Sequence, residues 1–599
     1  MNISSRRGDC AQWLLLAAAL LVTTGARGQS EAEFLRNLAT SGEVSWRSPA
    51  PPVDPVYLRI LGLNDLHGGL RPVPVDAGDG HTRPAGGAAV LAGYFAAERL
   101  QYPKHTLLFI AGDSIGASPA VSGLLHDEPT LAALNAMADG DCPPLKADWA
   151  RQAAPVTSRC HAFATLGNHE FDQGTAELER LLYGGKSTTG LRGGDWRGMK
   201  IPFLVANVTR ADGSPLLPAS AIVEVARVKI GVIGIVTART PGLVMANRIQ
   251  GLRFLPEAPA INAEVARLRA RGVHTIVLVI HEGLVTPATP QRFEPVPPAD
   301  LTGGLAAILG ALDGGVDIVI AGHTHKLNNV LVPLKDHHVA LVVQGRSGGT
   351  AYDSIDLTVD RSTGEMAAVA ARVRVPYADG GVEPDKGIAR IVEAAGHAVA
   401  AIEARPLVTA SNALRQPAAP CEESMLGNLF VDAQRSAAAT DFAFMNVGGL
   451  RASLEAGPVT FGALYAVHPF GNQVVRFTLT GADVVRLLEE QWSESHAALP
   501  LCLAPAGLRY AYDLRRAPGR RLVAAADAAG RPLDPAHRYS VAANDFLIGG
   551  GDEFAALTGV AAEPVPGVRE AVEAYLLSGP KPLVGTLDGR MMRVDVPPP

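Results

Sequence analysis

The sequence predicts a chain of two domains, a layered α/β domain followed by an α+β domain. The 599 residues are 47% hydrophobic and 19% charged, which is too long for one ordinary core and too apolar for disorder. Short apolar, β-branched runs recur in the first part, each followed by a polar cluster, with helical patterns between several of them. Around residues 371–405 a Gly- and Pro-containing stretch leads into an Ala-rich helical pattern, which is typical of a connection between domains.

The first 28 residues have the three parts of a secretory signal peptide. A basic start is followed by an apolar run at 13–22 and by small residues at Ala26 and Gly28. That run is short for a membrane span, and no other stretch approaches twenty apolar residues. We therefore expect a periplasmic or secreted protein with no membrane span, in which the Pro-rich segment 29–56 is a tether to the first strand.

The net charge of −6 argues against a nucleic acid polymer as partner, because such proteins usually present a basic surface. Any phosphate group should then be bound locally, by metal ions or a few arginines.

Five apolar runs are predicted strands that end in polar clusters, and two intervening segments have helical periodicity. Further strands are predicted in pairs, some of them antiparallel. The five strands are 57–63, 106–111, 163–166, 275–280 and 317–321, the helices are 86–99 and 258–271, and the further strands are 223–226, 228–236, 340–345 and 352–359.

The polar clusters contain oxygen and imidazole ligands and no thiolate. Two pairs are spaced by two residues, so on an extended segment each pair points to one side and can grip one ion. A single Asp after a strand is often a helix cap and a single His an ordinary polar residue, but the recurrence favours a metal site. The residues are Asp65, His67, Asp113, Asn168, His169, His281, His323 and His325.

The segment 167–172 has a second interpretation as a helix start, with Asn168 as its N-cap and the two carboxylates favouring the helix dipole. Its association with the other clusters favours chemistry instead.

These clusters resemble the five ordered motifs of the calcineurin-like metallophosphoesterases, over about residues 57–375. The continuation Glu170-Phe171-Asp172 narrows the resemblance to secreted 5'-nucleotidases and UDP-sugar hydrolases. It implies a four-layer αββα domain followed by an α+β 5'-nucleotidase C-terminal domain. The motifs are Asn64-Asp65-Leu66-His67, Gly112-Asp113, Gly167-Asn168-His169-Glu170, His281 and Gly322-His323-Thr324-His325.

The resemblance implies two divalent metal ions, for which mixed nitrogen and oxygen ligands suit zinc, manganese or iron. One ion would be held by Asp65, His67 and His325, the other by Asn168, His281 and His323, with Asp113 bridging both. His169 would act on the phosphoryl group and be oriented by Asp172, whose alternative role is that of a carboxylate at a helix N-terminus.

The second domain is predicted at 406–590, after a connecting helix or hinge at 376–405. Helices are expected at 386–404, 425–438 and 481–491, and strands at 442–446 and 538–543. Several of its segments resemble the 5'-nucleotidase substrate-binding domain: Gly427-Asn428-Leu429, Asn446 to Arg451, Pro469-Phe470-Gly471, Asn544 to Leu547 and Gly550-Gly551-Asp552.

The resemblance implies that Phe470 and Phe546 sandwich a nucleobase and that Asp552 binds ribose hydroxyls. Asn446 and Arg451 would reach toward the ribose and phosphate. Core packing is the alternative for each phenylalanine.

One position departs from the family pattern. No arginine stands just before Glu423, where family members usually have one, and Arg415 is the nearest candidate to replace it.

Four cysteines follow the predicted signal peptide. Cys142 and Cys160 bracket a Pro-containing insertion, which favours that disulfide and leaves Cys421 to pair with Cys502. Free buried thiols are the alternative.

The predicted function is release of phosphate from nucleoside 5'-monophosphates, with nucleotide diphosphates and UDP-sugars as further substrates. The alternatives are a 2',3'-cyclic phosphodiesterase or 3'-nucleotidase, a thiosulfohydrolase, and a binding protein that retains the fold. The paired phenylalanines and Asp552 favour nucleotides, and the ligand set and His169 favour an enzyme. The two domains are expected to rotate between open and closed forms. The oligomeric state stays open.

Overall fold

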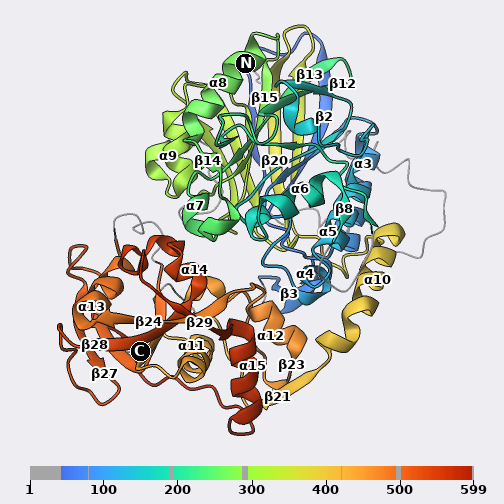
Figure 1. Ribbon diagram of the computed structural model, residues 1–599. Helices are drawn as coiled ribbons and strands as arrows, with labels where there is room; N and C mark the ends of the chain where they lie inside the picture. Colours follow the sequence, from blue (N-terminus) through green and yellow to red (C-terminus); the bar gives the residue numbers. More distant parts are fainter. Residues whose placement is uncertain are drawn as a thin grey trace, which may run out of the picture.

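The computed structural model describes residues 42–595 except 79, 188–194, 287–294, 418, 420 and 494–500. The predicted signal peptide and residues 29–41 of the expected tether lie outside the described residues. Figure 1 shows a first domain in blue to yellow and a second in orange to red, with the helix α10 (Lys386–Glu403) running along one side between them. Within the described part of the chain, no helix is both long and apolar enough to cross a membrane.

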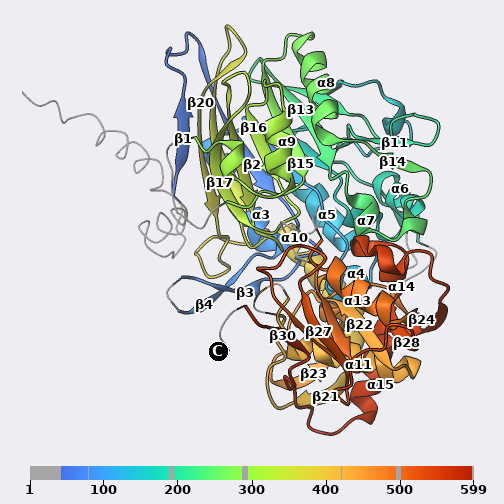
Figure 2. The ribbon, with the colours of Figure 1, turned by 90° about the vertical axis from the view of Figure 1, so that its left-hand side faces the viewer.

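Two seven-stranded sheets form the centre of the first domain, as Figure 2 shows from the side. In spatial order the first sheet is β1 (Val44–Arg47), β20 (Glu365–Arg374), β19 (Tyr352–Asp360), β2 (Pro55–Leu63), β5 (Thr106–Ala111), β7 (Ala162–Thr165) and β10 (Phe203–Leu204). The second sheet is β17 (Leu327–Pro333), β18 (Val339–Gly345), β16 (Ile318–Ala321), β15 (Thr275–His281), β13 (Val228–Val236), β12 (Ser220–Val225) and β6 (Val156–Ser158).

Strand β15 is a continuous apolar run in the sequence because both of its faces are covered. It is buried on both faces, because Val277 and Val279 belong to the core between the two sheets, whereas Ile276 and Leu278 belong to a core that includes residues of α8 and α9. The predicted αββα layering is therefore confirmed. The helices of this domain are α3 (Ala88–Gln101), α4 (Ala120–Gly123), α5 (Glu128–Met137), α6 (Thr175–Tyr183), α7 (Thr240–Leu243), α8 (Glu257–Arg269) and α9 (Gly304–Ala311).

The central strands of each sheet run parallel, so their carboxyl ends meet along one edge. Strand β2 pairs in parallel with β5 and β5 with β7, and in the other sheet β13, β15 and β16 are parallel neighbours. Every predicted polar cluster follows one of these strands, so the fold collects them at this edge.

Part of the segment expected to be a tether is a strand. Residues Val44–Arg47 form β1 and pair antiparallel with β20 at the edge of the first sheet. Val44 is buried there, and the chain leaves the sheet before β2 begins at Pro55. The pairing joins residues about 320 positions apart, which a local pattern does not indicate.

The second domain is built on a five-stranded sheet. Its order is β25 (Leu503–Ala506), β22 (Phe442–Asn446), β28 (Arg538–Asn544), β24 (Gln473–Thr480) and β29 (Glu563–Gly567). Two smaller sheets accompany it: β27 (Leu522–Asp527), β26 (Leu508–Tyr512) and β30 (Met591–Arg593), and β21 (Pro406–Ala410) with β23 (Gly457–Thr460). Its helices are α11 (Met425–Ala438), α12 (Phe461–Val467), α13 (Gly481–Glu490), α14 (Asp545–Ile548) and α15 (Val568–Ser578).

Both predicted cysteine pairs are disulfides. Cys142 is bonded to Cys160 and Cys421 to Cys502, with Cα atoms 4.5 Å and 5.1 Å apart. The second disulfide ties the loop before α11 to the start of β25 and so staples the second domain.

Candidate active site

A cavity of about 530 Å³ lies between the two domains, at the carboxyl edge of the sheets. The first domain contributes Asp113, Asn168, His169, Asp172, His323 and His325 to its lining. The second domain contributes Asn446, Arg451, Phe470, Phe546 and Asp552. Residues singled out from the two halves of the sequence therefore meet in one space, although Asp65, His67 and His281 do not line it themselves.

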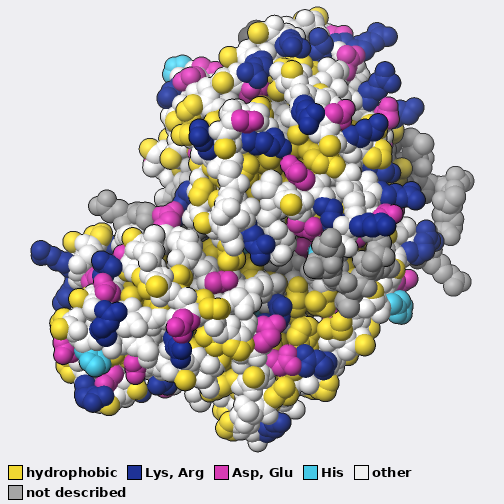
Figure 3. All heavy atoms as spheres, viewed as in Figure 1, with side chains coloured by type: hydrophobic (Ala, Val, Ile, Leu, Met, Phe, Trp, Pro, Cys, Tyr) yellow, Lys and Arg dark blue, Asp and Glu magenta, His cyan; other side chains and the backbone are white. Residues whose placement is uncertain are grey.

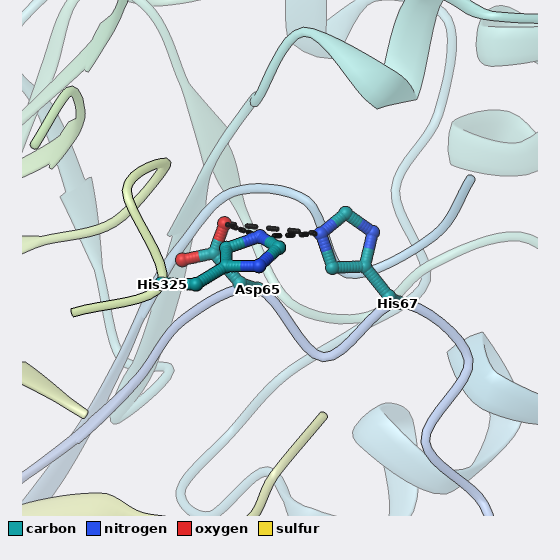
Figure 4. A group of neighbouring side chains, drawn as sticks. All are labelled: Asp65, His67 and His325. Atoms are coloured by element: carbon teal, nitrogen blue, oxygen red, sulfur yellow. Dashed lines mark hydrogen bonds and ion pairs between the residues drawn. The ribbon is translucent and has the colours of Figure 1, made fainter. Parts of the chain in front are cut away.

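The first group of possible metal ligands is Asp65, His67 and His325, drawn in Figure 4. The Nε2 atoms of the two imidazoles are 3.1 Å apart, and Asp65 Oδ1 lies 3.3 Å from His325 Nε2 and 3.9 Å from His67 Nε2. The three side chains come from the loops after β2 and β16 and converge on one point.

The second group is Asp113, His281 and His323, and a third group, His67, Asp113 and His169, shares residues with both. Asp113 Oδ2 lies 3.1 Å from His281 Nε2 and also 3.7 Å from His67 Nε2 in the first group, so this carboxylate faces both groups. Asn168 Oδ1 is 3.3 Å from His281 Nε2 and completes the set.

The tautomers of two imidazoles favour metal binding. The Nδ1 atoms of His67 and His281 lie 2.8 Å from the backbone carbonyls of Gly116 and Ala111, so each Nδ1 donates a proton and Nε2 is the nitrogen that can bind a metal ion. Lone pairs and buried carboxylates that face one another at these distances need cations between them. The donors present thus fit a pair of divalent ions.

The ligand-bearing loops have strained backbones. Asp65, His67, Asp113, His323 and His325 all have positive φ, between 44° and 73°. Non-glycine residues adopt this conformation at a cost of about 1–3 kcal/mol each, and such strain concentrates at functional sites. Asp65 and His67 face the same point, but His323 and His325 belong to different groups. The expectation that each closely spaced pair holds one ion is therefore wrong for His323 and His325, because their backbone is not extended.

His169 is held against the second group by two contacts. Its backbone N–H donates to Asp113 Oδ1 at 2.9 Å, and its Nδ1 lies 2.8 Å from Asp172 Oδ2. Burial alone would lower the pKa of His169, but the carboxylates of Asp172 and Asp113 raise it above its ordinary value. The imidazole can therefore hold a proton on the ring that faces the cavity.

Glu170 binds the backbone of two ligand-bearing loops and is not one of the assigned metal ligands. Its carboxylate accepts hydrogen bonds from the backbone N–H groups of Asp113, Ser114 and Gly167, at 2.6–2.9 Å. Burial and the nearby charge of Asp113 raise the pKa of Glu170 to about 7. One side chain thus joins the loops after β5 and β7.

The polar residues of the second domain form a short chain of hydrogen bonds. Asn544 Nδ2 donates to Asn446 Oδ1 at 2.8 Å, and Asn446 Nδ2 donates to Asp552 Oδ2 at 3.0 Å. Burial raises the pKa of Asp552 to about 6, although the bond from Asn446 lowers it. Arg451 lines the same cavity, where burial lowers the pKa of its guanidinium although the carboxylates of Asp113, Asp172 and Asp65 raise it.

The two phenylalanines occupy different places around the cavity. The ring of Phe470 stacks on His169, with centroids 5.9 Å apart and planes 22° apart. The ring of Phe546 lies against the backbone at Gly551, where an added Cβ would come within 2.4 Å of it. Both therefore face the cavity, and Phe470 also covers the imidazole of the first domain.

Arg415 does not reach the cavity. It is bonded to Glu455, and its side chain is 61% exposed. Arg239, Arg248 and Lys326 of the first domain line the cavity and were not predicted from the sequence. Lys326 directly follows the motif that ends at His325, whereas no motif marks Arg239 or Arg248.

The chain matches two known families. Residues 58–327 match the calcineurin-like phosphoesterases, and residues 399–559 match the 5'-nucleotidase C-terminal domain. The endonuclease YhcR of Bacillus subtilis is 30% identical over 547 residues, which cover 90% of this chain and 41% of that protein. The cell wall protein Lmo0130 of Listeria monocytogenes is 32% identical over 542 residues, covering 84% of this chain and 64% of that protein.

A solved structure is similar over most of the chain. The crystal structure of a 5'-nucleotidase precursor from Thermus thermophilus superposes with a TM-score of 0.72 at 26% identity, covering 90% of this chain and 100% of that chain. The protein described here belongs to the calcineurin-like metallophosphoesterases that carry a 5'-nucleotidase C-terminal domain. It spans less than two thirds of the length of both curated relatives.

Proposed function

We propose that the protein is a metal-dependent phosphohydrolase that releases phosphate from nucleoside 5'-monophosphates. The observation that carries the proposal is the composition of the cavity, where two groups of metal ligands face an aromatic and polar surface of the second domain. A small organic phosphate with a planar, polar leaving group fits both halves.

The metal ligands we assign follow the two groups. Asp65, His67 and His325 would hold one divalent ion, Asn168, His281 and His323 the other, and Asp113 would contact both. A pair of such ions, when bound, would lower the pKa of a bound water and stabilise the charge on the phosphoryl group during transfer. The donor types suit zinc, manganese or iron.

The other residues act on the substrate directly. His169, kept protonated by Asp172, donates a hydrogen bond to the phosphoryl group or a proton to the leaving oxygen. Arg451 offers its planar guanidinium to the phosphate from the opposite side. Asp552 accepts hydrogen bonds from the ribose diol, and Phe470 and Phe546 contact the base.

We also propose that the protein is exported to an oxidising compartment, the periplasm or the cell exterior. The two disulfides and the predicted signal peptide support this location.

The second candidate substrate is a polynucleotide, because one relative is named an endonuclease. The net charge of −6 speaks against it, as does the face in Figure 3, on which acidic and basic side chains are interspersed.

The test is a phosphate-release screen of the purified protein with zinc, manganese or iron added after chelation. The substrates are AMP, UDP-glucose, a 2',3'-cyclic nucleotide and para-nitrophenyl phosphate, with cleavage of an oligonucleotide followed in parallel. AMP should give the highest kcat/KM. Turnover of the aryl ester alone would contradict the nucleotide assignment.

His169→Ala should lower kcat by about 10²–10⁴-fold, because an acid–base group contributes about that much. Metal analysis of the same sample should still find two ions per chain, since His169 is not an assigned ligand. His338→Ala is the matched control, because that imidazole is paired with Asp317 away from the cavity. Equal loss in both variants would show that the effect is not specific.

A further inference from the structure

The two domains touch on both sides of the cavity. On one side α10 packs against α3, α4 and α5 of the first domain and against α12 of the second. On the other side α7 meets the short helical turn Gly551–Glu553 of the second domain. Figure 1 shows these contacts far apart, with α7 above α14 on the side opposite α10.

An ion pair joins the domains at α7. Arg239, at the N-terminus of α7, places Nη2 and Nε at 3.1 Å and 3.3 Å from Glu553 Oε1. The hydrocarbon part of Glu553 packs on Gly242, where an added Cβ would lie 3.0 Å from Glu553 Cγ. A larger side chain at position 242 would crowd this approach.

The backbone around Glu553 links the ion pair to the diol site. Asp552 and Glu553 both have positive φ, 55° and 57°, which is costly for non-glycine residues. Their side chains face different partners, because Asp552 is bonded to Asn446 and Glu553 to Arg239. One turn with positive φ at both residues thus carries the assigned diol-binding carboxylate and the residue that contacts the first domain.

Hydrogen bonds connect the backbone of Arg239 to the segment that carries the assigned ligand His281. The backbone N–H of Arg239 donates to Thr237 Oγ1 at 3.3 Å, and that hydroxyl donates to Glu282 Oε2 at 2.7 Å. Thr237 also donates its backbone N–H to the carbonyl of His281 at 3.0 Å. The segment that carries Arg239 is thus fixed to the loop of one assigned ligand.

We propose that the Arg239–Glu553 contact is a clasp that closes the cavity when a nucleoside occupies the diol site. Arg239 is a positioning residue, which holds the substrate-binding domain in register with the metal-ligand loops. The clasp rests on the proposed function, since it concerns the same cavity and the same diol. The clasp should raise kcat/KM more for substrates that contain a nucleoside than for a small phosphate ester, which meets the second domain through Arg451 but has no ribose for Asp552.

The test is a charge reversal with rescue. Arg239→Glu and Glu553→Arg should each lower kcat/KM for AMP by about tenfold, because each places like charges opposite one another at the rim. The double variant restores an opposite-charge pair and should recover most of the loss. Hydrolysis of para-nitrophenyl phosphate should fall clearly less than hydrolysis of AMP in the two single variants, because this ester has no ribose to contact Asp552. The turnover that remains also shows that the variants fold and bind metal.

A second readout does not depend on turnover. Small-angle X-ray scattering with saturating adenosine should give a smaller radius of gyration than without it for the wild type and the double variant, and no change for the single variants. Arg476→Glu is the matched control, because Arg476 forms an exposed pair with Glu563 inside the second domain. This variant should match the wild type in both assays.

Two outcomes would overturn the clasp: no recovery in the double variant, or an equal loss on the aryl ester. Failure of the proposed function looks different. In that case wild-type protein would release no phosphate from AMP, while the scattering experiment with adenosine would still report whether the clasp closes.

Discussion

The carboxyl group of Asp552 lies outside the metal-ligand groups, and its protonation can be measured through its effects on stability and ligand binding. Burial raises its pKa to about 6, well above the ordinary value of 3.8. The folded state therefore binds this proton more tightly than the unfolded state, and the stability it contributes at low pH is lost as the pH rises from about 4 to about 6. At neutral pH the buried carboxylate is charged, which lowers the free energy of unfolding. The same charge makes it a better hydrogen-bond acceptor for a ligand.

Asp552→Asn should therefore raise the free energy of unfolding at pH 7 and leave it unchanged near pH 3.5. Asparagine tolerates the positive φ of this position, so the backbone should keep its shape. Adenosine should bind the wild type more tightly as the pH rises through about 6, because the carboxylate is the better acceptor for the diol, whereas the variant should show no such change. Urea titrations and calorimetry at several pH values measure the two effects.

A nucleoside without phosphate is used so that no phosphate group titrates in the same range. Adenosine binding that is equally pH-dependent in both proteins would remove Asp552 from the diol site.

At the scale of elements, strands and helices with local periodicity could be predicted closely. The strand at 106–111, the helix at 425–438 and the strand at 442–446 have the predicted bounds. Strand β1 was missed, because an edge strand of four residues is specified by its partner and not by its own pattern. The grouping of the metal ligands came from the family resemblance, whereas spacing alone placed His323 and His325 on one ion, which the structure does not show. Arg239 could not be predicted, because its role depends on a contact with a residue 314 positions away.

The two disulfides should differ in their effect on stability. They close loops of 18 and 81 residues, for which the loss of chain entropy gives about 3 and about 4.5 kcal/mol. Replacing Cys421 and Cys502 by serine should therefore lower the free energy of unfolding more than replacing Cys142 and Cys160.

Tryptophan fluorescence can follow the second domain in this comparison. Trp492 is buried beside Cys421 and is the one tryptophan after residue 196 in the sequence. Trp46, Trp149 and Trp196 report on the first domain, so each is replaced by phenylalanine when Trp492 is followed. The midpoint of Trp492 in the Cys421/Cys502 variant is then compared with the midpoint of the Cys142/Cys160 variant followed by circular dichroism, and the first should fall further below its wild-type value. The reverse order would contradict the chain-entropy argument.

At the scale of the whole molecule, α7 and α10 join the domains on either side of the cavity. We propose that this is a closed form, which opens to exchange substrate and product. A crosslink between Gly242→Cys and Glu553→Cys should hold this form, since the two positions are in contact. Oxidation of the double variant should lower steady-state turnover of AMP by at least about tenfold, and mild reduction should restore it.

The reduced double variant is the reference, because Glu553→Cys also removes the ion pair with Arg239. Each single-cysteine variant, oxidised in the same way, controls for other effects of the oxidant. Full turnover in a completely crosslinked sample would show that the domains need not separate.

The clustering of the ligand loops at one sheet edge also bears on how the protein is made. The assigned metal ligands lie between Asp65 and His325, all in the first domain. A growing chain has therefore acquired the whole set before any residue of the second domain is synthesised. If the first domain folds on its own, it can take up its ions first, and the second domain then docks onto a centre that is already complete.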